Sequence, residues 1–90
     1  MPHIDALITA YTRAKAFAAA AESVELAKLD LDDAYRQWKR RNGINFTIAK
    51  GGASWNAMML ATAPSYRALT NAKARERRAK KKLLQAVEGA

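Results

Sequence analysis

The chain has 90 residues, enough for one small domain, and 21 of its 45 hydrophobic residues are alanines. Alanine favours helix strongly but buries little surface, so only 24 larger apolar side chains remain to build a core. The absence of cysteine excludes disulfide staples and thiolate metal sites and fits a reducing compartment. We therefore expect one modest domain of cytoplasmic location, whose stability would gain from burial against a partner.

The net charge of +8 is unevenly distributed along the chain. Residues 1–33 hold three basic and six acidic residues, a net charge of −3, whereas residues 34–90 hold thirteen basic and two acidic residues, a net charge of +11. This division predicts a polyanionic partner for the second half, acid–base pairing between the halves, or both.

The first residues carry no sign of a targeting segment. Charged residues at Asp5, Arg13 and Lys15 interrupt the apolar stretch, and the longest unbroken apolar run covers only residues 16–21. A signal peptide needs a basic leader before its apolar region, and a membrane-spanning helix needs about 20 apolar residues. We expect neither.

Residues 4–41 contain no proline or glycine and are predicted to form one long helix of ~57 Å at 1.5 Å per residue. A heptad seam of alternating three- and four-residue spacings runs through it, which indicates packing along another helix. The seam comprises Phe17, Ala20, Val24, Ala27, Leu31, Ala34 and Trp38, extended upstream by Leu7, Ala10 and Ala14. It would face the C-terminal helix or, in a homodimer, a second copy of the chain. A break at Asp30, capped by Asp30 and Asp33, is the alternative to one continuous helix.

Residues 42–53 are predicted to form a turn and an extended connector. Gly43 should end the long helix, because glycine adopts the left-handed C-terminal conformation without steric cost. Residues 44–48 then alternate apolar and polar, as a half-buried strand does, but a lone strand cannot satisfy its own backbone. We favour a connector whose Ile44, Phe46 and Ile48 plug the end of a helical bundle over a paired strand.

Two further helices are predicted. A short one over about 54–62 would be capped by Ser54, and the last one, over about 65–87, would be capped by Ser65 after Pro64 ends the short helix. The short helix has a dense apolar face, which serves as core or as a protein-docking patch. That face comprises Trp55, Met58, Met59 and Leu60. The last helix has a thinner apolar stripe, which comprises Leu69, Ala72, Ala79, Leu83, Ala86 and Val87. The predicted fold is an all-α hairpin or small bundle.

A block of seven positive charges within ten residues is the most specific feature of the chain. It comprises Lys73, Arg75, Arg77, Arg78, Lys80, Lys81 and Lys82. Each helical residue advances about 100°, so these charges must surround most of the helix and repel one another at i,i+3 and i,i+4. Phosphates would relieve that repulsion without requiring any particular fold. The alternatives are a solvated face and internal pairing with Asp30, Asp32 and Asp33.

A second basic cluster surrounds Trp38 at the end of the long helix and comprises Arg36, Lys39, Arg40 and Arg41. An indole among arginines can stack on unpaired bases. Trp38 also lies on the heptad seam, however, and we favour a core role for it. The basic residues would then interact favourably with the negative end of the helix dipole.

No pattern for catalysis is present. His3 is the only histidine, and without cysteine the chain offers no zinc site and no catalytic dyad or triad. We therefore expect no enzyme, no metal and no cofactor. The first hypothesis is a small accessory protein that binds DNA or RNA non-specifically through the last helix and the Arg36–Arg41 cluster. The second is an interaction module that docks on an acidic protein surface within a larger, nucleic-acid-processing complex, as phage-type inhibitors or adaptors do.

Overall fold

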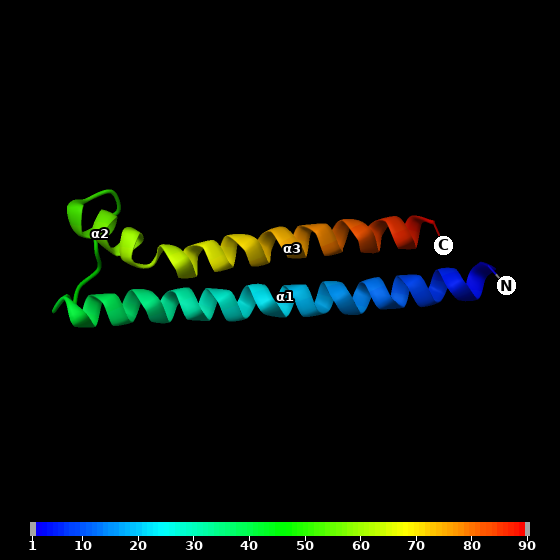
Figure 1. The fold of residues 1–90 in the computed structure, drawn as a ribbon, viewed down its shortest axis with the longest axis horizontal. Coiled ribbons are helices and arrows are strands. Elements are labelled where there is room, and N and C mark those ends of the chain that lie inside the picture. The colour runs from blue at the N-terminus through cyan, green and yellow to red at the C-terminus, as the bar shows by residue number, and fades with distance from the viewer. Residues whose placement is uncertain (1, 90) are drawn as a thin grey trace.

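The computed structural model describes residues 2–89, with side chains from residue 4 onwards. It contains three helices, α1 (Pro2–Arg41), α2 (Ala53–Ala61) and α3 (Ala63–Glu88), and no strand in the described part of the chain. Helices α1 and α3 lie side by side and antiparallel, so both ends of the described chain meet at one end of the molecule (Figure 1). The molecule measures 64 × 19 × 18 Å. The predicted all-α hairpin is confirmed.

Helix α1 runs without a break through Asp30, so the alternative of two shorter helices is wrong. It ends where the sequence predicted, at a glycine with a left-handed backbone: Gly43 has φ +68°. The Ile44 N–H donates to the Lys39 carbonyl at 2.9 Å and the Gly43 N–H donates to the Arg40 carbonyl at 3.2 Å. These two bonds are the Schellman arrangement, which satisfies carbonyls left without partners at the helix end and turns the chain sharply.

The seam predicted on α1 faces α3 of the same chain. Val24 and Leu31 of α1 form one buried cluster with Leu69 and Ala72 of α3, and every other predicted seam residue between 17 and 38 is partly buried. The seam is thus occupied within the chain and is not available for the homodimer that the sequence allowed. Its upstream extension was wrong at one position, because Leu7 is 64% exposed. The heptad register passes instead through Ala6, Ala10 and Arg13, which are partly buried.

Small and large residues alternate along both sides of the seam. On α1 alanines at 20, 27 and 34 alternate with Phe17, Val24, Leu31 and Trp38. On α3 the small residues at 65, 72, 79 and 86 alternate with larger residues at 69, 76 and 83, all of them at least partly buried. Alanine lets the helix backbones approach, and the larger side chains fill the space between alanine layers. The predicted apolar stripe of α3 holds except at Val87, which is exposed.

Helix α2 and the connector close one end of the hairpin. Residues 42–52 form turns and irregular backbone, in agreement with the predicted connector. Ile44 and Ile48 are partly buried, but Phe46 is 63% exposed and does not plug the bundle as predicted. Met58 of α2 is buried, because the helix lies across the end of α1 with Met58 and Trp55 beside Tyr35 and Ile48.

The starts of α2 and α3 differ from the prediction. The N-cap of α2 is Gly52 rather than Ser54, and α3 begins at Ala63 rather than after Ser65. Pro64 lies inside the first turn of α3, where a backbone N–H has no intrahelical acceptor and proline therefore loses no hydrogen bond. Thr62 separates the helices, and its buried hydroxyl donates to the Met58 carbonyl at 2.7 Å.

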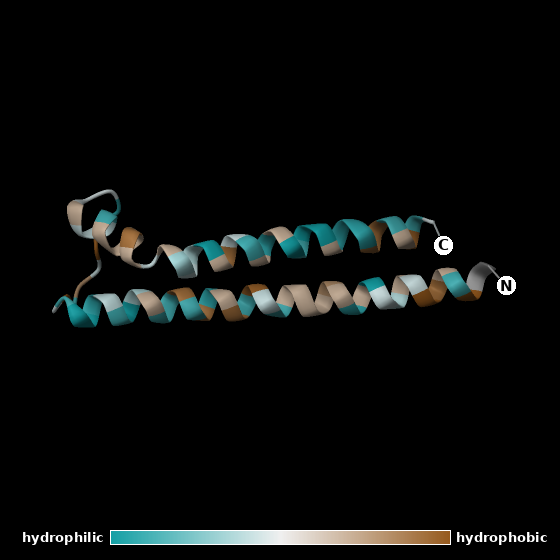
Figure 2. Cartoon of the chain, viewed as in Figure 1, coloured by the Kyte–Doolittle hydropathy of each residue, from teal (hydrophilic) through white to brown (hydrophobic). Residues whose placement is uncertain are grey.

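Hydropathy colouring shows a largely hydrophilic α3 beside an α1 of mixed character (Figure 2). None of the described helices combines the length and the apolar composition needed to cross a bilayer.

Replacing Leu31 by alanine should lower the free energy of unfolding by about 2–5 kcal/mol, because Leu31 is buried where α1 and α3 meet. Thermal and urea unfolding followed by circular dichroism measure this loss. The matched control is Leu60→Ala, which makes the same truncation at a side chain that is 80% exposed and should change stability little. Equal effects of the two substitutions would contradict the observed seam.

Replacing Gly43 by alanine should cost about 1 kcal/mol, because an L-residue is strained at positive φ. No atom lies within 4 Å of an added Cβ, so the cost is conformational and not steric contact with a neighbour. Gly43→Asn is the control, since asparagine tolerates the left-handed region better and should cost less. A larger loss for asparagine than for alanine in urea unfolding would argue against this turn.

Candidate nucleic-acid interface

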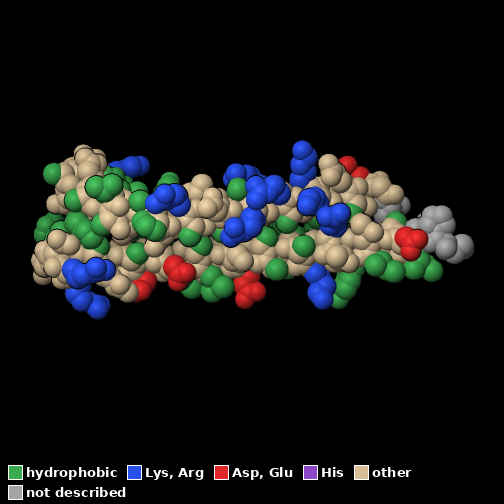
Figure 3. All heavy atoms as spheres, viewed as in Figure 1, with side chains coloured by type: hydrophobic (Ala, Val, Ile, Leu, Met, Phe, Trp, Pro, Cys, Tyr) green, Lys and Arg blue, Asp and Glu red, His purple; other side chains and the backbone are tan. Residues whose placement is uncertain are grey.

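The seven basic side chains of residues 73–82 are all exposed on α3. This basic block begins four residues after the buried Leu69 and continues towards the open end of the hairpin. The seam occupies one face of the helix, and the 100° advance per residue spreads the charges over the remaining circumference. The space-filling view shows Lys and Arg side chains gathered over this part of α3 (Figure 3).

The antiparallel packing of α3 on α1 does not bring acidic side chains into ion pairs with the basic block. Within residues 4–89 the single ion pair joins Lys28 and Glu25 at 3.2 Å, and both residues belong to α1. The predicted internal partners, Asp30, Asp32 and Asp33, are exposed and make no ion pair with α3. They flank Leu31, which packs in the same cluster as Leu69. After Leu69, α3 continues towards the open end of the hairpin, so residues 73–82 lie further from the three aspartates along the axis. The acidic residues and the basic block therefore lie at different heights of the hairpin.

A groove between the two long helices is lined by residues of α1 and by residues of the basic block. Arg13 of α1 and Arg75, Arg78 and Lys82 of α3 line a hollow of about 190 Å³ together with two alanines, Ala16 and Ala79. The small alanine side chains leave space between the helices, and the long basic side chains surround it. Four positive charges around one groove suit the oxygens of a phosphate backbone.

Arg13 was missed as a candidate because its neighbours in sequence belong to the acidic half of the chain. The signal that identifies it is its position on the heptad register, between Ala10 and Phe17, which turns it towards α3.

A partly buried residue on the same seam, Glu76, interrupts the apolar stripe of α3. It fills the gap between Ala72 and Ala79 in that stripe and makes no ion pair with any described residue.

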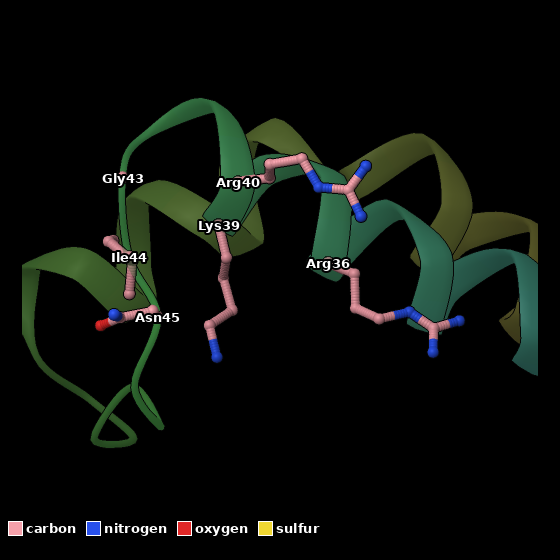
Figure 4. A pocket seen from close by; sticks show the side chains of 6 residues that line it. All are labelled: Arg36, Lys39, Arg40, Gly43, Ile44 and Asn45. Carbon is pink, nitrogen blue, oxygen red and sulfur yellow. The ribbon is translucent and has the colours of Figure 1, made fainter.

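The second predicted cluster lies at the closed end of the hairpin and is divided. Arg36, Lys39 and Arg40 line a hollow of about 480 Å³ with Gly43, Ile44 and Asn45 of the connector. In Figure 4 the Lys39 side chain points into the hollow beside Ile44 and Asn45, whereas the Arg40 guanidinium extends away from the connector. The Schellman turn creates this hollow because it brings Ile44 back beside Lys39. Arg41 lines a different hollow, with Trp38 and Pro64.

The two basic regions are separate along the molecule. Helix α3 begins at the closed end, and its residues 73–82 lie about 15–29 Å further along at 1.5 Å per residue. The closed-end residues and the basic block therefore do not form one compact patch. A partner must be extended to contact both.

The aromatic and apolar candidates are mainly packing residues. Trp38 is partly buried on the seam, as favoured from the sequence. Among the four residues of the predicted docking patch, Met58 is buried, Trp55 and Met59 are partly buried, and Leu60 is exposed.

Tyr35 ties α1 to α2 at this end of the hairpin. Its hydroxyl donates to the Met59 sulfur at 3.6 Å. Burial raises the pKa of the Tyr35 phenol above its ordinary value, with further contributions from Tyr66 and Asp32. The tyrosine therefore stays neutral to higher pH than an exposed one and keeps this hydrogen bond.

The described side chains contain no group of three or more His, Asp or Glu residues close enough to hold a metal ion. The side chain of His3 lies outside that part of the structure. Comparison of the chain with protein-family models, curated proteins and solved structures finds no match. The geometry of the basic surface is therefore the basis for a functional proposal.

Replacing Lys81 by glutamate should stabilise the protein at low salt. Lys81 lies one helical turn after Arg77 and Arg78, so the substitution converts two repulsive pairs into attractive ones, a gain of roughly 1 kcal/mol. Urea unfolding at low and high salt measures the gain, which should shrink as salt screens the charges. Lys81→Gln, which only removes the repulsion, should give about half the effect. A destabilised Lys81→Glu variant would show that the block is neutralised within the chain.

Proposed function

We propose that the protein is a non-enzymatic accessory protein that binds nucleic acid non-specifically through the basic surface of α3. The observation that supports this most is the set of seven exposed positive charges without an ion-pair partner among residues 4–89. Binding a polyanion removes their mutual repulsion and releases counterions from the phosphates. The proposed setting is the cytoplasm, which the cysteine-free composition fits.

The charge spacing of the block is close to that of DNA. Seven charges over ten helical residues give one positive charge per ~2 Å of axis, whereas duplex DNA carries one negative charge per ~1.7 Å. The groove at Arg13, Arg75, Arg78 and Lys82 offers a place for one backbone segment. These contacts address phosphates and not base edges, so the proposed binding has little sequence preference.

A second candidate is an interaction module that docks on an acidic protein surface. It is favoured by the exposed Leu60, the one member of the α2 apolar group that packing leaves largely free. The same basic block would then contact carboxylates in place of phosphates. The two candidates differ in what the purified protein binds and in how binding responds to salt.

The affinity of the purified protein for duplex DNA should fall steeply with salt. With ~5 phosphates contacted, a plot of log affinity against log salt should have a slope near −4.5. Replacing the groove residues Arg75, Arg78 and Lys82 with alanine should flatten this slope by ~2–3 units. Fluorescence anisotropy with two unrelated duplex sequences measures both the slope and the expected lack of sequence preference.

The matched control replaces Arg36, Lys39 and Arg40 with alanine. It removes the same three charges at the closed end, outside the basic block, and should change the slope less. Equal effects of the two triple variants would show that binding follows net charge and not the α3 surface. Failure to bind DNA or RNA at low salt, together with a stoichiometric protein partner that survives nuclease treatment, would refute the proposal in favour of the second candidate.

A further inference from the structure

Helix α1 carries a second apolar stripe on the face that points away from α3. Its large members are Ile4, Ile8, Tyr11, Leu26 and Leu29, with Leu7 on its flank, and they are between 55% and 66% exposed. They follow the same three- and four-residue spacing as the seam but are rotated to the opposite side of the helix. Helix α3 occupies the other side, and α2 lies at the closed end, so no part of the described chain covers this stripe.

The outer stripe is complementary to itself when two copies run antiparallel. With a two-fold axis between Ala18 and Ala19, the residue numbers of opposing positions add to 37. Ile8 then lies opposite Leu29 of the second copy, and Tyr11 lies opposite Leu26. The two exposed alanines meet at the centre, where small residues allow the helices to approach, as they do in the α1–α3 seam.

The charges within the stripe follow the same symmetry. Lys15 and Glu22 interrupt it between Tyr11 and Leu26, and they too add to 37. Glu25, on the flank of the stripe, forms an ion pair with Lys28 of its own helix. The Lys15 ammonium lies 5.6 Å from the centre of the Tyr11 ring, along the stripe. An antiparallel dimer forms two Lys15–Glu22 pairs, whereas a parallel one would place like charges opposite each other. The complementary pairing ends at Ile4, because this apolar residue falls opposite the charged Asp33 of the second copy. The interface therefore spans residues 8–29.

The overall charge distribution is compatible with this arrangement. Each chain carries +8, which opposes self-association, but residues 8–29 hold three basic and two acidic residues, so the interface itself is nearly neutral. Pairing through the outer face of α1 places the two α3 helices on opposite outer sides, separated by two helix diameters of about 10 Å each. The basic blocks are thereby kept apart and remain exposed.

We propose that two copies of the chain associate antiparallel through residues 8–29 of α1, forming a four-helix assembly with a basic α3 on each outer side. The interface is isologous, so each pair of contacts occurs twice about the axis. The partner is a second copy because one helix face supplies both halves of every apolar and charged pair. This inference stands whether or not the protein binds nucleic acid.

Sedimentation equilibrium over a range of protein concentrations, without nucleic acid, should show reversible association from 9.9 kDa to twice that mass. Glu22→Lys creates two repulsive Lys–Lys pairs and should weaken the dimer by roughly tenfold. Adding Lys15→Glu to it restores opposite charges and should restore the dimer. The control Glu88→Lys makes the same charge change on an exposed residue of α3 and should have little effect. Circular dichroism verifies that each variant remains helical.

The orientation has its own test, because the natural chain has no cysteine. A mixture of Ile8→Cys and Leu29→Cys proteins should form a disulfide-linked dimer on mild oxidation, in preference to either protein alone. A parallel dimer would instead cross-link Ile8→Cys to itself. The proposal is overturned by a wild-type mass that stays at 9.9 kDa at millimolar concentration, by equal effects of Glu22→Lys and Glu88→Lys, or by failure of the double variant to recover.

Discussion

The packing of α1 against α3 through alternating small and large residues is the constraint on which the rest of the molecule depends. Only five hydrophobic residues of the described chain are buried, and none of its side chains is completely enclosed. With so little core, stability requires many shallow contacts along a long interface. The alanine layers make this possible, because they allow close approach of the backbones over the whole length of the shorter helix.

A two-helix seam leaves most of each helix surface uncovered, and this determines where charge can be placed. On α3 the seam takes one narrow face, so seven basic residues within one stretch necessarily become surface. Because α3 runs antiparallel to α1, its basic block leaves the level of Asp30, Asp32 and Asp33 and reaches that of Arg13. The hairpin therefore concentrates positive charge instead of cancelling it, although the sequence contains acidic residues that were candidates for pairing.

The two long helices present outer surfaces of different chemistry. The outside of α3 is basic, whereas the face of α1 that points away from α3 carries a stripe of exposed apolar residues between residues 4 and 29. The two proposed interactions, with a polyanion and with a second copy of the chain, therefore use different surfaces and need not compete. The closed end is distinct from both, since its basic residues surround a hollow made by the turn at Gly43.

Local sequence determined most of the secondary structure. The stretch without proline or glycine gave one long helix, the heptad spacing identified the buried face around Val24 and Leu31, and Gly43 marked the helix end. These features depend on backbone preference and periodicity, which act over a few residues. The errors at Pro64 and Ser65 have a local cause too, because proline is compatible both with the end of one helix and with the first turn of the next. At α2 both Gly52 and Ser54 are residue types that can cap a helix, and the structure uses Gly52.

The sites were only partly predictable. The sequence identified the basic block and its exposure, since seven charges in ten residues cannot all be buried. It did not show that Arg13 belongs with the block, that Arg41 is separate from Arg36, or that Phe46 is exposed, because each depends on which surface lies alongside. The choice between a second copy and α3 as the partner of the seam was likewise left open. Only the tertiary structure decided these points. Hydrophobic periodicity identifies which face of a helix is buried, but it does not determine which residues of another helix lie beside that face.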